Sequence, residues 1–222
     1  MFSRKELKQA DTTFPDGRLK EKKSFLNGKL EGEYVSYFSN GQVMLRQFYR
    51  GGMREGEAVS FYKNGNIREK GAFKRDKLDG AYESYYEDGS IKEKEYYAGG
   101  KPDGKYEFYL PGGILKEEEN FKDGRFNGEY RSFYRSGELR EKGAFRNDKR
   151  HGEYVTFYKN GSVKQRAHYE DGKLVGEFTS YERGGQPSVL QDEDTDLENE
   201  EARREFDQML KKLESPNGEE PK

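Results

Sequence analysis

One glycine recurs every 24 residues along the chain, and no insertion or deletion disturbs its spacing. This glycine occupies Gly32, Gly56, Gly80, Gly104, Gly128, Gly152 and Gly176. A second glycine keeps the same period at Gly17, Gly41, Gly65, Gly89, Gly113, Gly137, Gly161 and Gly185. A fixed period of this length is typical of repeat proteins, in which each unit packs only against its neighbours. We therefore expect one array with a tail, rather than the one or two globular domains that 222 residues could otherwise form.

Each unit contains a hairpin signal at the second glycine. The dipeptide there is Asn-Gly or Asp-Gly in several units, as at Asn64-Gly65, Asp88-Gly89 and Asn160-Gly161. These residues suit the positive φ angles of a two-residue type I′ turn. The segment that leads to the next unit is also bounded by glycines. We expect an all-β fold, an elongated single-layer antiparallel β-meander of 24-residue hairpins, stabilised by the stacking of neighbouring units.

The composition excludes several classes of protein. Apolar residues make up only 31% of the chain and charged residues 38%, but 17 tyrosines and 15 phenylalanines can build a thin core. The absence of cysteine excludes disulfides, thiolate zinc sites and cysteine nucleophiles. No apolar run approaches the length of a membrane span, and none follows the basic N-terminus as a signal peptide requires. We expect a soluble cytoplasmic protein.

Alternation along each strand assigns two faces to the predicted sheet. Face A is defined by Tyr154, Thr156, Tyr158, Val163, Gln165, Ala167, Tyr169 and their equivalents in other units. Its aliphatic column near the turn consists of Leu19, Val43, Ile67, Ile91, Leu115, Leu139 and Val163. Face B carries the remaining aromatic column. Charges of the second strands alternate in sign, as in Arg68-Glu69-Lys70, so the basic residues share face B and the acidic residues share face A.

Face B is the candidate partner-binding surface, because basic columns flank an aromatic column there. This layout can bind anionic lipid, a polyanion or an acidic protein segment. The alternative is that lysine and arginine stems lie across the rings and that first-strand glutamates neutralise the bases. The candidates are Tyr37, Phe61, Tyr85, Tyr109, Phe133, Phe157, Tyr181, Arg68, Lys70, Lys92, Lys94, Arg140, Lys142, Lys164 and Arg166.

The ends of the chain depart from the repeat. We expect a lead-in over residues 1–13, an array of seven to eight hairpins over 14–185, and an acidic linker over 186–194. Thr195 and Glu198 have the spacing of a capping box, and apolar residues from Leu197 to Leu213 recur at helical spacing. An amphipathic helix is therefore predicted over 195–214, with a disordered tail over 215–222. It could cover the last hairpin, form a dimer or bind a partner.

No constellation in the sequence predicts catalysis. His151 and His168 belong to different elements, and the repeated column of serines and Thr156 is explained by small residues between aromatic rows. Gly99 to Lys105 matches the start of a phosphate loop, but Tyr106 stands where serine or threonine is required. We expect no catalytic residue, no cofactor and no metal site, and hence no enzyme.

The phase of glycines and aromatics in residues 145–154 (FRNDKRHGEY) and 169–178 (YEDGKLVGEF) resembles the MORN repeat, specifically its bacterial variant. The likeness extends over residues 14–185 and includes YwqK-type proteins, which are labelled antitoxins. The resemblance implies an elongated sheet used for protein contacts, and lipid contacts in some eukaryotic relatives. The predicted function is a non-catalytic scaffold for a protein partner, with an antitoxin-like role as one form of it. The alternative is a peripheral binder of anionic lipid or polyanion through face B. Nucleic acid is not expected, and a homodimer stays open.

Overall fold

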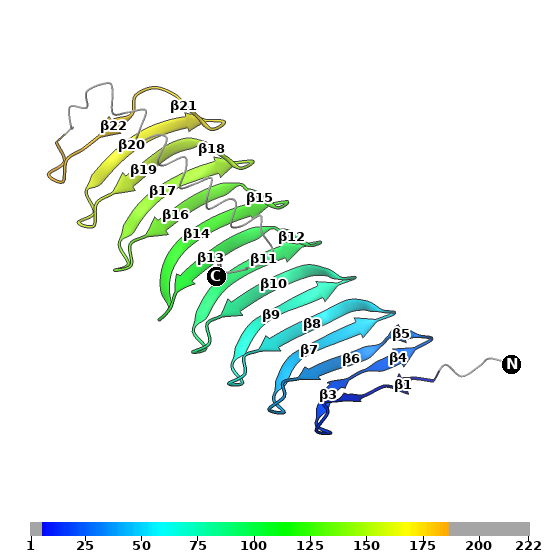
Figure 1. Cartoon of the computed structure of the whole chain (residues 1–222). Helices are drawn as coiled ribbons and strands as arrows, with labels where there is room; N and C mark the ends of the chain where they lie inside the picture. The colour runs from blue at the N-terminus through cyan, green and yellow to red at the C-terminus, as the bar shows by residue number, and fades with distance from the viewer. Residues whose placement is uncertain (1–5, 187–222) are drawn as a thin grey trace.

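The computed structural model describes residues 6–186, which form strands and turns throughout (Figure 1). The strands follow one another along a single elongated ribbon in chain order. This confirms the predicted single-layer antiparallel meander. The predicted helix over 195–214, the tail over 215–222 and nearly all of the linker over 186–194 lie outside the described residues.

Strands of the first half are β1 (Lys8–Gln9), β2 (Thr12–Thr13), β3 (Leu19–Lys22), β4 (Ser24–Leu26), β5 (Lys29–Leu30), β6 (Gly32–Tyr37), β7 (Val43–Arg50), β8 (Met53–Phe61), β9 (Ile67–Lys74), β10 (Lys77–Tyr85) and β11 (Ile91–Ala98). Those of the second half are β12 (Lys101–Pro102), β13 (Gly104–Leu110), β14 (Ile114–Lys122), β15 (Arg125–Phe126), β16 (Gly128–Phe133), β17 (Leu139–Arg146), β18 (Lys149–Arg150), β19 (Gly152–Phe157), β20 (Val163–Glu170), β21 (Lys173–Leu174) and β22 (Thr179–Ser180).

The long strands pair antiparallel with their neighbours in sequence, from β2 with β3 to β20 with β22. Short strands such as β15 and β18 pair with the end of the preceding long strand, where the chain turns into the next unit. At the N-terminus β1, β4 and β5 form a three-stranded sheet. Strand pairing therefore begins at Lys8, within the segment predicted as a lead-in.

The turns at Asn-Gly and Asp-Gly differ from the prediction. Among the described residues of the Asn160-Gly161 turn, only Gly161 has a positive φ, of 83°. The Tyr158 N–H donates to the Ser162 carbonyl at 2.9 Å, and the Asn160 side chain accepts the Ser162 N–H at 3.1 Å. This is a three-residue loop with a glycine bulge, which the asparagine side chain supports. The two-residue turns with two positive φ angles lie at the opposite edge, as at Asn147 (49°) and Asp148 (67°).

The second strands contain a bulge, and because of it part of the predicted face assignment is wrong. Tyr154 pairs with Ala167 and Thr156 with Gln165, which confirms the centre of face A. The register then shifts by one residue, and Val163 lies opposite Phe157. Directly opposed residues share a face, so the aliphatic column predicted on face A lies with the aromatic column of face B. The same shift recurs opposite Tyr37, Phe61, Tyr85, Tyr109 and Phe133.

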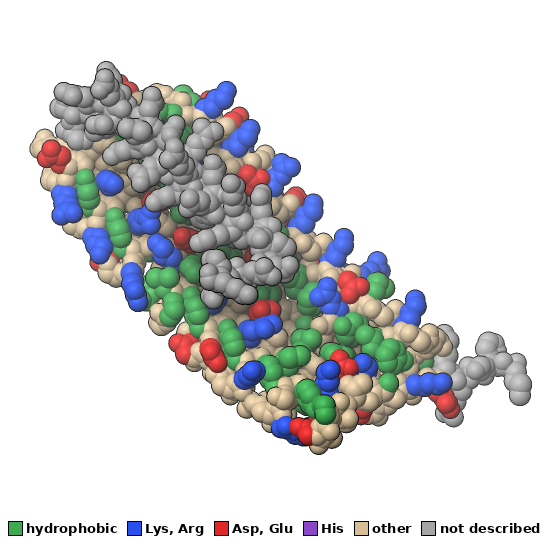
Figure 2. Space-filling model, viewed as in Figure 1, with side chains coloured by type: hydrophobic (Ala, Val, Ile, Leu, Met, Phe, Trp, Pro, Cys, Tyr) green, Lys and Arg blue, Asp and Glu red, His purple; other side chains and the backbone are tan. Residues whose placement is uncertain are grey.

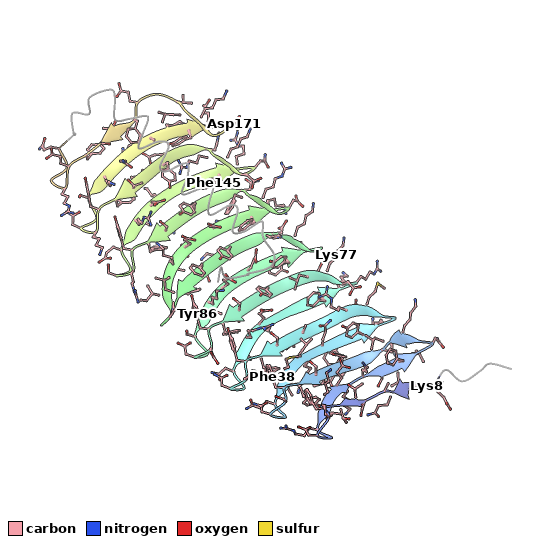
Figure 3. All side chains as sticks on the ribbon, in the orientation of Figure 1. Lys8, Phe38, Lys77, Tyr86, Phe145 and Asp171 are labelled. Atoms are coloured by element: carbon pink, nitrogen blue, oxygen red, sulfur yellow. The ribbon has the colours of Figure 1, made fainter. Side chains whose placement is uncertain are left out.

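The core lies on face A and is built from aromatic rings. Phe126, Tyr130 and Phe145 form a buried cluster, and the Tyr130 and Phe145 rings meet edge to face with centroids 5.8 Å apart. Figure 3 shows such side chains standing along the ribbon. A Cβ atom at Gly143 would overlap the Tyr154 ring, which explains glycine at that position. The core is therefore one ring deep.

Tyrosine hydroxyls near the hairpin turns join neighbouring repeats. Each donates to a backbone carbonyl of the following unit at 2.7 to 2.9 Å. The donor and acceptor pairs are Tyr62 with Tyr85, Tyr86 with Tyr109, Tyr134 with Phe157, and Tyr158 with Tyr181. These bonds fix the stacking of units that would be unstable alone.

Candidate functional site

The structure brings bases and rings together on face B, as predicted. In three repeats a lysine Nζ lies 5.5 to 5.9 Å from a ring centroid. The pairs are Lys70 with Tyr85, Lys94 with Tyr109, and Lys142 with Phe157. This is the cation–π geometry in which a lysine stem lies across an aromatic ring. The rings thus already have cationic partners within the sheet.

First-strand glutamates neutralise much of the positive charge on face B. Lys70 Nζ lies 2.9 Å from Glu83, and Arg166 Nε lies 3.3 Å from Glu153. Burial alone would raise the pKa of Glu83, but hydrogen bonds from Tyr85 and Lys70 outweigh it and lower that pKa. Many bases of face B are therefore paired with carboxylates, and this face is not an open basic surface.

The other candidates on face B have different surroundings. Three bases contact the acidic residue that follows them in their own strand, at 2.9 to 3.9 Å. These pairs are Arg68 with Glu69, Lys92 with Glu93, and Arg140 with Glu141. Lys164 is exposed. The aromatic candidates form one half-buried row, namely Tyr37, Phe61, Tyr85, Tyr109, Phe133, Phe157 and Tyr181.

Face A gathers the acidic residues, as predicted, and alternates them with hydroxyl side chains. Ser132 pairs with both Glu117 and Glu141, and Ser84 donates to Glu93 at 2.9 Å. The Tyr154 hydroxyl donates to Glu141 at 2.5 Å. Burial raises the pKa of Glu117. Face A is therefore aromatic and acidic. Its second-strand carboxyls lie among aromatic rings, whereas the first-strand carboxyls of face B pair with bases.

Glu119 is the most buried carboxyl of face A, and sequence reasoning did not single it out. Its exposure is 1%, and its Oε2 atom has no hydrogen-bond partner among residues 6–186. Burial, with Glu117 and Glu95 nearby, raises its pKa to about 8. A signal was present in the sequence, because four equivalent positions hold a small or neutral residue and only Glu95 is also a carboxyl. The four are Gln47, Gly71, Gly143 and Ala167.

A row of basic residues runs along the edge formed by the turns between units. This turn-edge row consists of Lys29, Lys77, Lys101, Arg125, Lys149 and Lys173. All six are exposed, and Figure 2 shows basic side chains lining one long margin of the molecule. The Lys77 stem lies against the turn of the next unit, 3.3 Å from where a Gly100 Cβ would be. Sequence reasoning missed this row because it considered only the two faces.

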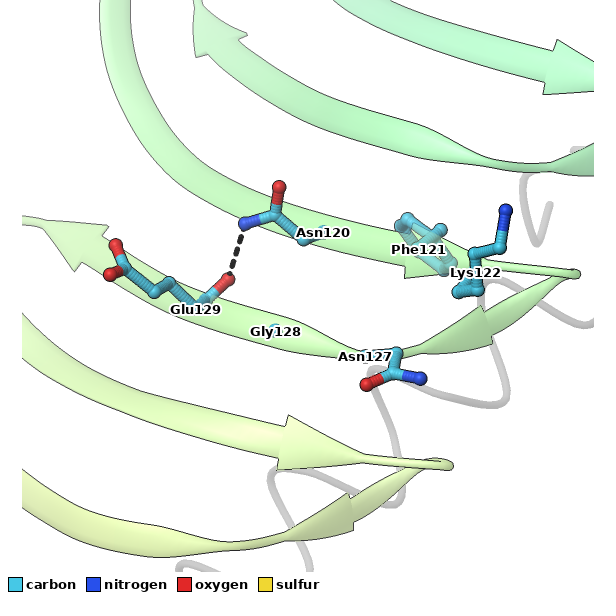
Figure 4. A pocket seen from close by; sticks show the side chains of 6 residues that line it. All are labelled: Asn120, Phe121, Lys122, Asn127, Gly128 and Glu129. Atoms are coloured by element: carbon cyan, nitrogen blue, oxygen red, sulfur yellow. Dashed lines mark hydrogen bonds between the residues drawn. The ribbon is translucent and has the colours of Figure 1, made fainter.

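The shallow depression in Figure 4 offers no catalytic grouping. It is lined by Asn120, Phe121, Lys122, Asn127, Gly128 and Glu129. The Asn120 amide donates to the Glu129 backbone carbonyl at 2.9 Å. Within residues 6–186, no group of three histidine or carboxylate side chains could hold a metal ion. In the same residues, no helix is long and apolar enough to cross a membrane.

Comparison with known families identifies the repeat. A family model described as "MORN repeat variant" matches six consecutive segments, namely residues 30–50, 54–75, 78–101, 102–123, 126–147 and 150–171. Each segment spans one hairpin, with its first strand, its turn and its second strand, as residues 54–75 span β8 and β9. A comparison with curated proteins gives no significant match.

Proposed function

The chain belongs to the MORN repeat variant family, and from this membership we propose that it is a non-catalytic cytoplasmic scaffold that binds a partner protein along its array. MORN repeats are modules that bind proteins or lipids. One form of this proposal is an antitoxin-like role, in which the partner is a toxin. The half-buried aromatic row of face B is the observation that carries it.

That row suits a protein partner better than a polyanion. Aromatic side chains are enriched at the centres of protein interfaces, where they contribute apolar area at low entropic cost. The bases beside the row are held by acids, as Lys94 is by Glu107 at 3.8 Å. A partner that contacts several repeats would contact one equivalent aromatic ring in each repeat. An extended segment or a flat β-surface fits this geometry.

Photocrosslinking in the native host tests the proposal. We expect p-benzoylphenylalanine in place of Phe133, in the centre of the row, to give one discrete protein adduct. The same group in place of Met53, which is 44% exposed at the turn edge, should give none. Excess wild-type protein should compete the adduct away. Tyr109→Ser/Phe133→Ser should compete roughly 30-fold less well, since loss of an interface anchor costs about 2 kcal/mol.

Two outcomes contradict this use of face B. The first is an adduct that forms equally from both positions. The second is equal competition by the wild-type and double-variant proteins, because the aromatic row would then contribute nothing to recognition.

The turn-edge row favours a second function, the binding of an anionic lipid surface. Among the described residues, Lys77, Lys101 and Lys149 enter no ion pair within 4 Å, whereas Lys70, Lys94 and Arg166 of face B do. Members one repeat apart, from Lys77 to Lys173, stand about 10 Å apart, which is two strand spacings, so several could touch one flat surface. Flexible lysines on one edge are a suitable contact for anionic headgroups. This assigns the proposed lipid contact to an edge rather than to face B.

Vesicle flotation tests the lipid function. We expect salt-sensitive binding to phosphatidylcholine vesicles that contain phosphatidylserine, and none to phosphatidylcholine alone. Lys101→Gln/Lys149→Gln should weaken it by roughly 30-fold, since each base near an anionic surface contributes about 1 kcal/mol. Lys94→Gln/Lys142→Gln on face B is the matched control and should bind as wild type does. If only the face B variant lost binding, the lipid contact would lie on face B instead of the turn edge. If the wild type did not bind the vesicles, the proposed lipid function would be wrong.

A further inference from the structure

Equivalent positions on face A differ in exposure along the array. Phe145 is 5% exposed, whereas Phe73 and Tyr97, at the same repeat position in earlier units, are half-buried. Tyr130 is 7% exposed, and its earlier equivalent Tyr82 is half-buried. We call Tyr106, Phe121, Phe126, Tyr130, Phe145 and Tyr154 the aromatic strip. Part of this difference arises within the sheet, because Phe126, at a position that holds no aromatic residue in the other units, places its ring 5.7 Å from that of Phe145.

A one-layer sheet leaves such a strip in need of a second layer. Apolar faces of sheets are normally buried against another element. Within residues 6–186 every element belongs to the sheet or its turns. A further 36 residues of the chain follow Gln186, at the end of the array nearest to the strip. These 36 residues are therefore the candidates for a segment that covers the strip.

The predicted helix over 195–214 has a suitable length for this cover. Twenty residues of α-helix extend about 30 Å. The strip runs from β13 to β19, which is four strand spacings in the ladder, or about 19 Å. Residues 187–194 give the chain room to turn back over the sheet before the helix begins.

The apolar side of the predicted helix and the aromatic strip are also chemically complementary. Phe206, Met209, Leu210 and Leu213 lie on one side of the predicted helix and match the aromatic rings in character. The segment is acidic overall, so its contact with face A must be apolar rather than electrostatic. Glu119, in the middle of the strip, is buried without an ion-pair partner and with a raised pKa, so it is mostly neutral at pH 7.

We propose that residues 195–214 form a helix that packs its apolar side on the aromatic strip of face A, within the same chain. Face A is then closed to other partners, and the binding surfaces available to them are face B and the turn edge. This inference does not depend on the proposed function, and its test contains no partner.

Cysteine crosslinking tests the docking, because the chain contains no native cysteine. One cysteine replaces Glu205, beside the apolar side of the predicted helix. The second replaces Glu141 (face A, β17), Lys142 (face B, next residue of β17) or Glu69 (face A, three repeats earlier). We expect a short bis-maleimide to link Glu205→Cys to Glu141→Cys within one monomer, several-fold more efficiently than in either control pair.

A disruptive substitution checks the role of the apolar side. Phe206→Asp should reduce the Glu141→Cys link several-fold, whereas Gln208→Asp, on the opposite side of the helix, should leave it unchanged. Equal links in all three pairs would indicate an untethered segment and overturn the proposal. Links found only between two chains would indicate a dimer and overturn it as well. A link that favours Lys142→Cys would place the segment on face B.

Discussion

Replacing Phe145 with alanine is expected to destabilise the second half of the array by about 3–5 kcal/mol, the usual cost of emptying a buried phenylalanine site. Phe145 is 5% exposed and contacts Phe126 and Tyr130, with ring centroids 5.7 and 5.8 Å away. Within residues 6–186 the core is one ring deep, so the sheet itself offers no further layer that could collapse into the space. The loss should therefore lie near the upper end of this range.

Hydrogen exchange with thermal unfolding is the appropriate measurement, because a repeat array need not unfold in one step. Protection should fall in β16 to β20 and persist in β6 to β9. Phe73→Ala is the matched control, since Phe73 holds the same repeat position but is half-buried beneath Arg54, 4.2 Å from its ring. A larger loss in Phe73→Ala than in Phe145→Ala would show that the core is not centred on the second half.

The buried carboxyl of Glu119 should make the protein less stable as the pH rises. Its pKa in the folded state is about 8, against 4.5 for an ordinary glutamate, so the folded state holds a proton that the unfolded chain releases. Stability therefore falls between about pH 4.5 and pH 8, by up to about 5 kcal/mol. The groups that face Glu119 are Tyr106, Glu117 and Glu95, and none of them supplies a positive charge.

Glu119→Gln should remove most of this dependence, because an amide has no proton to lose. We expect the variant to be more stable than the wild type at about pH 9 and similar to it at about pH 5, in urea unfolding followed by circular dichroism. Glu129→Gln makes the same change at a side chain that is 72% exposed on face B and should retain the wild-type profile. An unchanged profile in Glu119→Gln would assign the pH dependence to other groups.

Alternation in the sequence predicted the faces of second-strand side chains beyond the bulge, from Gln165 to Tyr169 in β20, because alternation along a regular strand depends only on the backbone. It did not predict what each charge contacts. Lys70 is paired with Glu83, whereas Lys77 has no ion pair with a described residue, although both are lysines of regular repeat positions. Such pairing depends on how far apart side chains of different strands lie. That distance is set when the strands stack.

The 24-residue glycine period alone determined the architecture, because glycine at fixed spacing permits the positive φ angles that turn the chain at each repeat. The tertiary structure decided three further points. Glycine in the Asn160-Gly161 turn takes a bulge geometry that moves Val163 to face B. Glu119 is buried among rings contributed by separate strands. The turn-edge row forms only when successive units stack, since its members are 24 or 48 residues apart in the chain. Backbone conformation at the turns depends on short stretches of sequence. Side-chain burial and ion pairing depend on contacts between repeats.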